Sequence, residues 1–192
     1  SKFGTTIQVQ PFFGADDQVA SSLLTTLSSW TSNHKLSGLC YIAFRFTWDN
    51  DIYTGIPNIQ AIVQGRKIST FDASSNETTS QFSSNPAFCL LDYLTNTRYG
   101  KGIPIGDIDI PSFYSASQVA ITQVTPFSGG SQINLFDCNA VIDTGQKLID
   151  NTRTLLKGMR GFLPYTQGKY KLIIETTGSS VLTLDEDNII GL

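Results

Sequence analysis

Residues 85–103 constrain the fold of this chain more than any other stretch of its sequence. Asn85 is a residue type that caps helices, and Pro86 suits the first helical position because its missing N–H would have no partner there. Apolar side chains then recur at helical spacing until Gly100 and Gly102 interrupt the pattern. The stretch predicts a capped amphipathic helix that runs into a glycine-rich turn, with no residue suited to catalysis. The inward stripe is expected to hold Ala87, Phe88, Leu90, Leu91, Leu94 and Thr95.

Few of the residues on the surface of this protein can be charged. The chain has 192 residues, of which 40% are hydrophobic and 15% charged, and its formal net charge is −3. Charged residues average nearer a quarter in soluble domains, so Ser, Thr, Asn and Gln must cover much of the surface. Such a surface suits extracellular particles or subunits of larger assemblies. No run of Lys or Arg offers a footprint for a nucleic-acid backbone, and no apolar run approaches the length of a membrane span.

Strand patterns lie on both sides of a helical block. The order predicts an α+β fold in which antiparallel sheet or barrel-like elements flank that block. We expect a β-rich part with one short helix at 1–71, a mainly helical insertion with one strand at 72–160, and a returning β-hairpin at 161–192; one compact unit is the alternative. Strand alternation is expected for residues 5–10, 39–48, 58–64, 67–71, 133–141, 162–174 and 181–184. Helical spacing, caps included, is expected for residues 16–30, 85–95, 109–120 and 143–159, and a polar loop for 72–84.

The aromatic residues of the strand at 39–48 bear on function. Phe44, Phe46 and Trp48 fall on one strand face with Ile42, which favours burial in a core. Exposed aromatic side chains would instead favour a carbohydrate-binding platform.

No catalytic constellation is visible in the sequence. His34 is the only histidine, and its polar neighbours predict an exposed loop position. Asp49-Asn50-Asp51 begins like a calcium loop, but Gln60 occupies the twelfth position, where the loop needs a bidentate Glu. We therefore predict no metal, no cofactor and no enzyme activity. A pair of carboxylates for glycoside hydrolysis stays open, because such pairs meet in space and not in sequence.

The three cysteines are expected to be structural. Cys40, Cys89 and Cys138 are widely spaced, no CxxC is present, and each has apolar neighbours. Small buried hydrophobes are the favoured interpretation, and pairing between two of them stays open.

Short segments along nearly the whole chain follow an order that is typical of one protein family. They are residues 30–34, 38–46, 55–67, 85–103, 108–113, 138–144, 159–161, 168–169 and 184–189. Together they resemble the lambda-type host-specificity proteins, the central tail hub family of long-tailed bacteriophages. The chain departs from the family pattern at two places: after Lys67, where the Asp-Pro-Arg of the family is missing, and after Phe113. The structural positions that match the family are Gly55, Pro57, Asn58, Gly65, Asn85, Pro86, Leu91, Asp92, Tyr93, Gly100, Cys138 and Asp143.

The resemblance implies a structural component of a phage or prophage tail tip, within a longer protein. Such a hub closes the tail tube and links it to the fibre that binds the host receptor. It implies other tail-tip proteins as partners and a homotrimer in the virion, with the isolated fragment monomeric. Regions outside the fragment would contact the receptor, and assembly would take place in the host cytoplasm. The alternatives are a receptor- or glycan-binding module of the tail tip and a cell-wall hydrolase.

Overall fold

A computed structural model describes residues 6–176, which fall into two compact units divided between Ile62 and Val63. The expected division had its first boundary at residue 71 and set the last hairpin apart, whereas here the helices and that hairpin share the second unit. The strand expected at 181–184 lies outside the described residues.

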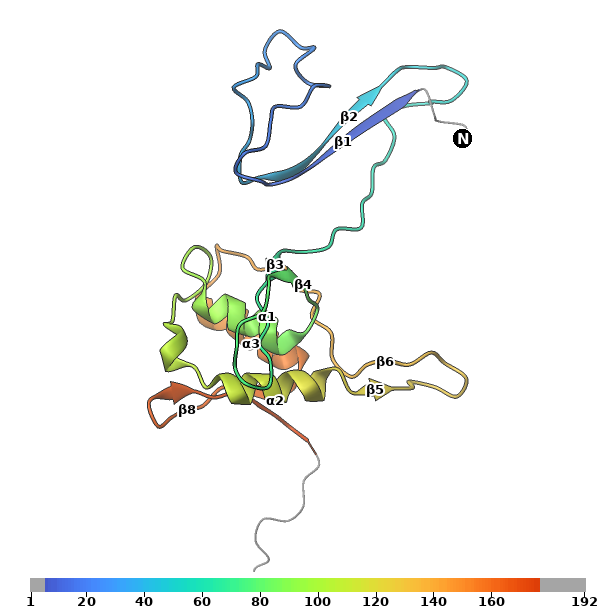
Figure 1. The fold of residues 1–192 in the computed structure, drawn as a ribbon. Helices are drawn as coiled ribbons and strands as arrows, with labels where there is room; N and C mark the ends of the chain where they lie inside the picture. Colours follow the sequence, from blue (N-terminus) through green and yellow to red (C-terminus); the bar gives the residue numbers. More distant parts are fainter. Residues whose placement is uncertain (1–5, 177–192) are drawn as a thin grey trace, which may run out of the picture. The chain divides into compact units, whose positions relative to one another are not determined.

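The first unit is built on one antiparallel hairpin. Strand β1 (Ile7–Phe13) pairs with strand β2 (Cys40–Phe46) along its whole length (Figure 1). Both expected strands are confirmed, and β1 continues beyond the predicted residue 10. Pro11 lies within it, which an edge strand tolerates because one side of the strand needs no N–H donors.

Turns replace the helix expected at residues 16–30. Leu24 N donates to Ser21 O at 3.1 Å and Leu27 N donates to Leu24 O at 2.9 Å, but these bonds do not extend into a helix. Ser and Thr compete for backbone groups with their own side chains, which weakens a helix here. The buried side chain of Gln18 closes the loop instead, since its Nε2 donates to Lys35 O at 3.0 Å and Leu39 O at 3.1 Å.

The strand expected at residues 58–64 is also absent. This segment is coil, and Ile62 is fully exposed, with a relative exposure of 104%. Its alternating pattern could form a strand only beside a sheet edge, and no described strand pairs with it.

The second unit packs three α-helices around one core (Figure 1). They are α1 (Pro86–Thr95), α2 (Ile110–Ala120) and α3 (Leu148–Gly158). Helix α1 packs against both of the others and buries the apolar residues of the predicted stripe together with Tyr93, while Thr95 is half-buried. The buried core holds Ile68, Ala87, Phe88, Leu90, Leu91, Tyr93, Leu94, Ile108, Ile110, Phe113, Ala116, Leu155, Met159, Leu172 and Ile174.

Short antiparallel strand pairs surround these helices. The described strands form separate two-stranded sheets and none closes into a barrel, so the α+β class is confirmed without barrel-like elements. Gln167 and Gly168, with φ of 54° and 78°, make the expected turn of the last hairpin. The pairs are β3 (Lys67–Ile68) with β4 (Gln81–Phe82), β5 (Gln123–Val124) with β6 (Ile133–Asn134), β7 (Gly161–Phe162) with β10 (Ile173–Ile174), and β8 (Tyr165–Thr166) with β9 (Lys169–Tyr170). A 3₁₀ helix, η1, spans Ile105–Asp107.

Two segments differ from expectation in this unit. The segment expected as a polar loop at 72–84 contains the turn and the second arm of a hairpin, because Phe71 forms a bridge with Glu77 and β4 lies beyond it. The strand expected at 133–141 is confined to β6. Beyond it the chain leaves the strand pair, and Val141 is 94% exposed.

The first two helices begin where the sequence predicts. Asn85 caps α1, since its Oδ1 accepts from Ala87 N at 3.1 Å, and its Nδ2 donates to Ser117 O of α2 at 3.0 Å. Asp109 occupies the cap position of α2 without a side-chain bond, and Ser112 Oγ donates to Asp109 O at 2.7 Å instead. Asn85 therefore joins the start of one helix to the end of the other.

Helix α3 begins later than predicted, and only part of its predicted inward face is buried. That face was expected to hold Leu148, Ile149, Thr152, Leu155, Leu156 and Met159, of which Thr152, Leu155 and Met159 are buried. The expected cap at Asp143-Thr144 is wrong: Asp143 Oδ1 accepts from Gly145 N at 2.8 Å in a turn before the helix, and Lys147 precedes its first residue. Its buried residues are Asn151, Thr152 and Leu155, while Leu148 and Ile149 are 39% and 51% exposed.

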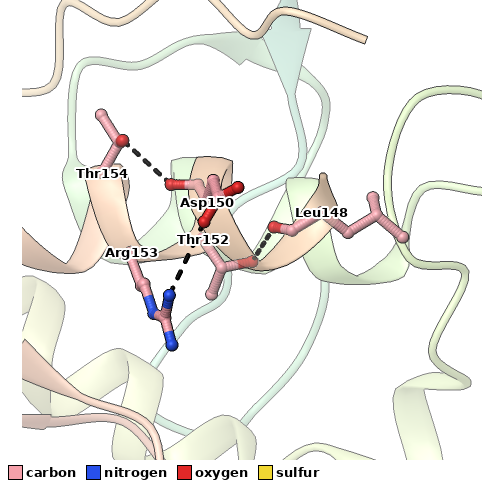
Figure 2. A network of polar contacts seen from close by, with 5 residues as sticks. All are labelled: Leu148, Asp150, Thr152, Arg153 and Thr154. Atoms are coloured by element: carbon pink, nitrogen blue, oxygen red, sulfur yellow. Dashed lines mark hydrogen bonds and ion pairs between the residues drawn. The ribbon is translucent and has the colours of Figure 1, made fainter. Parts of the chain in front are cut away.

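Hydroxyl groups on α3 bond to the carbonyls of its own preceding turn (Figure 2). Thr152 Oγ1 donates to Leu148 O at 2.8 Å, and Thr154 Oγ1 donates to Asp150 O at 2.9 Å. Arg153 lies 3.6 Å from the Asp150 carboxylate on the exposed side. An exposed pair of this kind contributes little to stability, so the buried side of α3 holds it in place.

The double role of Asn85 gives a test of the helix junction. Asn85→Ala should lower the free energy of unfolding by about 1–2 kcal/mol, because it removes both the cap and the bond to α2. Asn85→Ser keeps a capping oxygen and should lose less. Urea denaturation of both variants checks this, and equal losses in the two would contradict the capping role.

Candidate functional site

One face of the β1–β2 hairpin is apolar across both strands. In an antiparallel pair, directly opposed residues share a face and every second residue repeats it. The observed register therefore places one set of opposed pairs on a single face, which we call the apolar face. The apolar face consists of Ile7, Val9, Pro11, Phe13, Cys40, Ile42, Phe44 and Phe46.

The apolar face is open to solvent. Phe13 is 85% exposed, Val9 54% and Ile42 38%. Soluble proteins rarely leave a contiguous apolar surface uncovered unless it binds something. A two-stranded hairpin is also marginally stable by itself in water. The apolar face is therefore a candidate interaction surface.

The opposite face of the hairpin is covered over part of its length. Phe12 stacks on Tyr41 with ring centroids 4.5 Å apart, and both Phe12 and Ala43 are buried. From the long loop between the strands, Ser21 Oγ donates to Gln10 Oε1 at 2.8 Å. The hairpin thus has one side that is packed over part of its length, and an apolar side on which Tyr53 contacts only the Phe46 end.

The aromatic group expected in the core is only partly buried. Phe44 and Phe46 are half-buried and Trp48 is 60% exposed, so the prediction is wrong for Trp48. Phe46 and Trp48 each contact the buried ring of Tyr53, at centroid distances of 6.1 and 5.9 Å. Two open hollows of the surface, near Pro104 and near Arg160, lie in the second unit, so this group lines neither of them.

These two hollows hold no pair of carboxylates. Glu175 is the one acid that lines the hollow near Arg160, and Asp107 is the one acid that lines the hollow near Pro104. Glycoside hydrolysis uses two carboxyl groups across one bond. Within residues 6–176, no cluster of three or more His, Cys, Asp or Glu side chains could hold a metal ion.

His34 lies in the exposed loop of the first unit, as predicted. Its Nδ1 accepts from Thr31 N at 3.0 Å, and its ring stacks on Trp30 at 4.9 Å. These contacts are local, and they explain the residue without a catalytic role.

No helix in the described part of the chain is long and apolar enough to cross a membrane.

The positions of the resemblance from Asn85 onward gather around α1. At Gly100 a Cβ would lie 1.8 Å from Tyr93 O, so no other residue fits without a shift of the backbone. The chain passes this close because Lys101 N donates to Tyr93 O at 3.1 Å and Ile103 N to Leu94 O at 2.9 Å. These bonds satisfy carbonyls that a helix end leaves without partners.

Asp92 anchors the same turn from the side. The Tyr99 hydroxyl donates to the Asp92 carboxylate, and the Arg66 guanidinium lies 5.3 Å from the centre of the Tyr99 ring. Burial raises the pKa of Tyr99, and the bond to Asp92 raises it further. Tyr99 therefore stays a hydrogen-bond donor at any physiological pH.

Tyr93 and Asp143 meet through Asn151, a residue that the sequence reading missed. Asn151 Nδ2 donates to Tyr93 OH at 3.1 Å and to Asp143 O at 2.9 Å, and Asn151 is buried. The sequence signal that could have identified Asn151 is an amide on the inward side of a helix, where a polar group needs hydrogen-bond partners.

The remaining motif positions fall into two groups. Pro86 and Leu91 are buried in the helical unit, and Cys138 is half-buried, with its N–H donating to Ser84 O at 2.6 Å. The others lie in the coil at residues 55–65, and none of them lines either hollow. At Gly55 and Gly65 a Cβ would meet nothing within 4 Å, so local packing gives no reason for glycine there. This second group consists of Gly55, Pro57, Asn58 and Gly65.

Comparison with known proteins points to phage tails. The chain is similar to the baseplate hub protein pb3 of Escherichia phage T5, with 24% identity over 212 aligned residues. The alignment covers 93% of this chain and 22% of that protein, so the chain spans about a fifth of its relative. The chain matches no model of a known protein family. The expected likeness to phage tail hub proteins is confirmed at this level, and it supports a structural role in a phage tail or baseplate.

Gly100 offers a direct test of the turn after α1. Gly100→Ala should lower the free energy of unfolding by about 3 kcal/mol or more, because the new methyl group overlaps a backbone carbonyl. Gly106→Ala is the matched control, since a Cβ there would meet nothing within 4 Å. It should stay within about 0.5 kcal/mol of the original chain. Similar thermal unfolding of both variants would contradict the close approach.

Proposed function

We propose that this chain is a structural segment of a lambda-type central hub at the tail tip of a phage or prophage. In that role it helps to close the tail tube and links it to the fibre that binds the host receptor. The similarity to a baseplate hub protein across both units supports the class of protein. The observation that carries the role of this segment is the bare apolar face of the hairpin.

An assembled hub would supply the missing cover of that face. A second sheet layer packs on such a surface about 10 Å away and excludes water from both. In the virion, neighbouring copies in a homotrimer and other tail-tip proteins provide this layer. The isolated chain is monomeric in this proposal, because parts of the longer protein contribute to the same contacts.

The second unit has a supporting role that needs no catalysis. It has its own core, and its motif residues cap, turn or pack instead of pointing together into a cleft. We assign it no enzyme activity and no cofactor. Other regions of the longer protein contact the receptor. The protein assembles into tails in the host cytoplasm and is part of the tail tip in the virion.

The test replaces an exposed residue of the apolar face in the complete hub gene of the phage. Phe13→Asp should leave the fold intact, because an 85% exposed side chain contributes little to it. It should nevertheless bury a charge in the assembled hub, and so reduce plaque titre by about a hundredfold or more. Electron microscopy should then show tails without complete tips, although immunoblotting detects normal amounts of the hub protein.

Val19→Asp is the matched control for this experiment. Val19 is 66% exposed and lies in the loop of the same unit, off the apolar face. The plaque titre of the Val19→Asp phage should equal that of the original phage. Normal tails and normal titre for Phe13→Asp would overturn the proposal for this face.

The receptor- or glycan-binding alternative rests on the exposure of Trp48. It predicts a different result in the same experiment: complete tails that fail to adsorb to the host. Trp48→Ala would then reproduce the defect. Clearing of a peptidoglycan suspension by the purified chain would instead indicate the cell-wall hydrolase.

A further inference from the structure

Two of the three thiols meet in the second unit. Cys89 lies near the start of α1, and Cys138 lies in the segment after β6. Both side chains are half-buried against the helical core, and each shifts the pKa of the other. Neither is bonded covalently to another cysteine.

The surrounding backbone holds the two residues together independently of the thiols. Cys138 N donates to Ser84 O at 2.6 Å, and Ser84 Oγ donates to the carboxylate of the neighbouring Asp137 at 2.8 Å. On the other side, Cys89 Sγ lies 3.5 Å from Ser83 O. The strand end before α1 thus contacts both cysteines, and it fixes the distance between residues that are far apart in the sequence.

Packing alone does not explain this arrangement. A single buried cysteine behaves as a small hydrophobe, and an Ala or Val would serve as well. Two neighbouring thiols that are only half-buried have a chemistry that two alkyl groups lack. A disulfide between them would join α1 to residues 135–142, a segment that otherwise has little regular structure.

We propose that Cys89 and Cys138 form a reversible disulfide by exchange with a small soluble disulfide such as oxidised glutathione. One cysteine loses its proton to water and its thiolate attacks a sulfur of glutathione disulfide, which releases one glutathione thiolate. The second cysteine, after losing its own proton, attacks the mixed disulfide and releases the second glutathione. Two protein thiols are oxidised to one disulfide, and one glutathione disulfide is reduced to two thiols.

The local electrostatics suit the first step. The neighbouring Cys89 side chain lowers the pKa of Cys138, while the interaction with Cys138 and burial raise the pKa of Cys89. The attacking species in exchange is the thiolate. Cys138 is therefore the cysteine that attacks, and Cys89 is the one that resolves the mixed disulfide.

The experiment uses the purified full chain with Cys40→Ser, which removes the exposed third thiol. After incubation with oxidised glutathione at neutral pH, thiol titration should find no free thiol. Mass spectrometry should find the loss of two hydrogens, and peptide mapping should find Cys89 joined to Cys138. The midpoint of thermal unfolding should rise by about 5–10 °C and return after dithiothreitol, because the bridge closes a long loop.

The single variants Cys89→Ser and Cys138→Ser, each combined with Cys40→Ser, are the controls. Each should keep its circular dichroism spectrum and show no rise in unfolding temperature with oxidant. Cys138→Ser should also form the mixed disulfide with glutathione more slowly than Cys89→Ser. Two attached glutathiones, or two unreacted thiols in the folded Cys40→Ser chain, would overturn the proposal.

A consequence for the virion rests on the proposed function. A hub assembled in a reducing cytoplasm would carry the two thiols, and the bridge would form after release. Alkylation of particles before and after exposure to oxidised glutathione, followed by peptide mapping, distinguishes these states. A disulfide that forms in the purified chain but never in particles would contradict only this consequence.

Discussion

The second unit depends on the passage of the backbone over the end of α1, which only a residue without a side chain allows. At Gly100 the chain lies against the carbonyl of Tyr93, and the N–H groups of Lys101 and Ile103 bond to the last turn of the helix. This return directs the chain toward α2, whose far end bonds back to Asn85 at the other end of α1. Both ends of one helix are thus fixed by backbone or cap contacts, and its side chains are free to form the core.

The two units are stabilised in different ways. The helical unit buries a continuous apolar core and satisfies its inward polar groups, as the bonds of Asn151 to Tyr93 and Asp143 illustrate. The hairpin unit leaves most of one side of its sheet exposed and holds its loop with the amide of Gln18. A two-stranded hairpin is marginally stable by itself, and the exposed apolar side chains of this one are available for a further contact.

Sequence reasoning succeeded where the signal was local. The cap at Asn85, the proline after it and the Gln167-Gly168 turn are each specified by neighbouring residues, and the structure has them where expected. It failed where the outcome depends on a partner distant in the sequence. The alternating segment at 58–64 has no sheet to join among the described residues, so its pattern produces no strand.

The same limit applies to the candidate site. The alternation of β1 and β2 predicts their faces, but whether a face is covered cannot be read from either strand alone. Trp48 was assigned to a core that does not close over it, and Asn151 was missed because its partners lie on other elements. The apolar face can be identified only once the register of the two strands is known.

The chemistry of the apolar face separates the two main functions considered for it. A surface that binds sugars combines an aromatic platform with side chains that bond to hydroxyl groups. The apolar face carries aliphatic residues, two rings stacked on each other at Phe44 and Phe46, a proline and a cysteine, and none of these is a strong hydrogen-bond donor or acceptor. A second protein layer needs only apolar side chains at this spacing, and the apolar face carries them on both strands. An assembly contact therefore accounts for the whole face, whereas glycan binding would account for Trp48 alone.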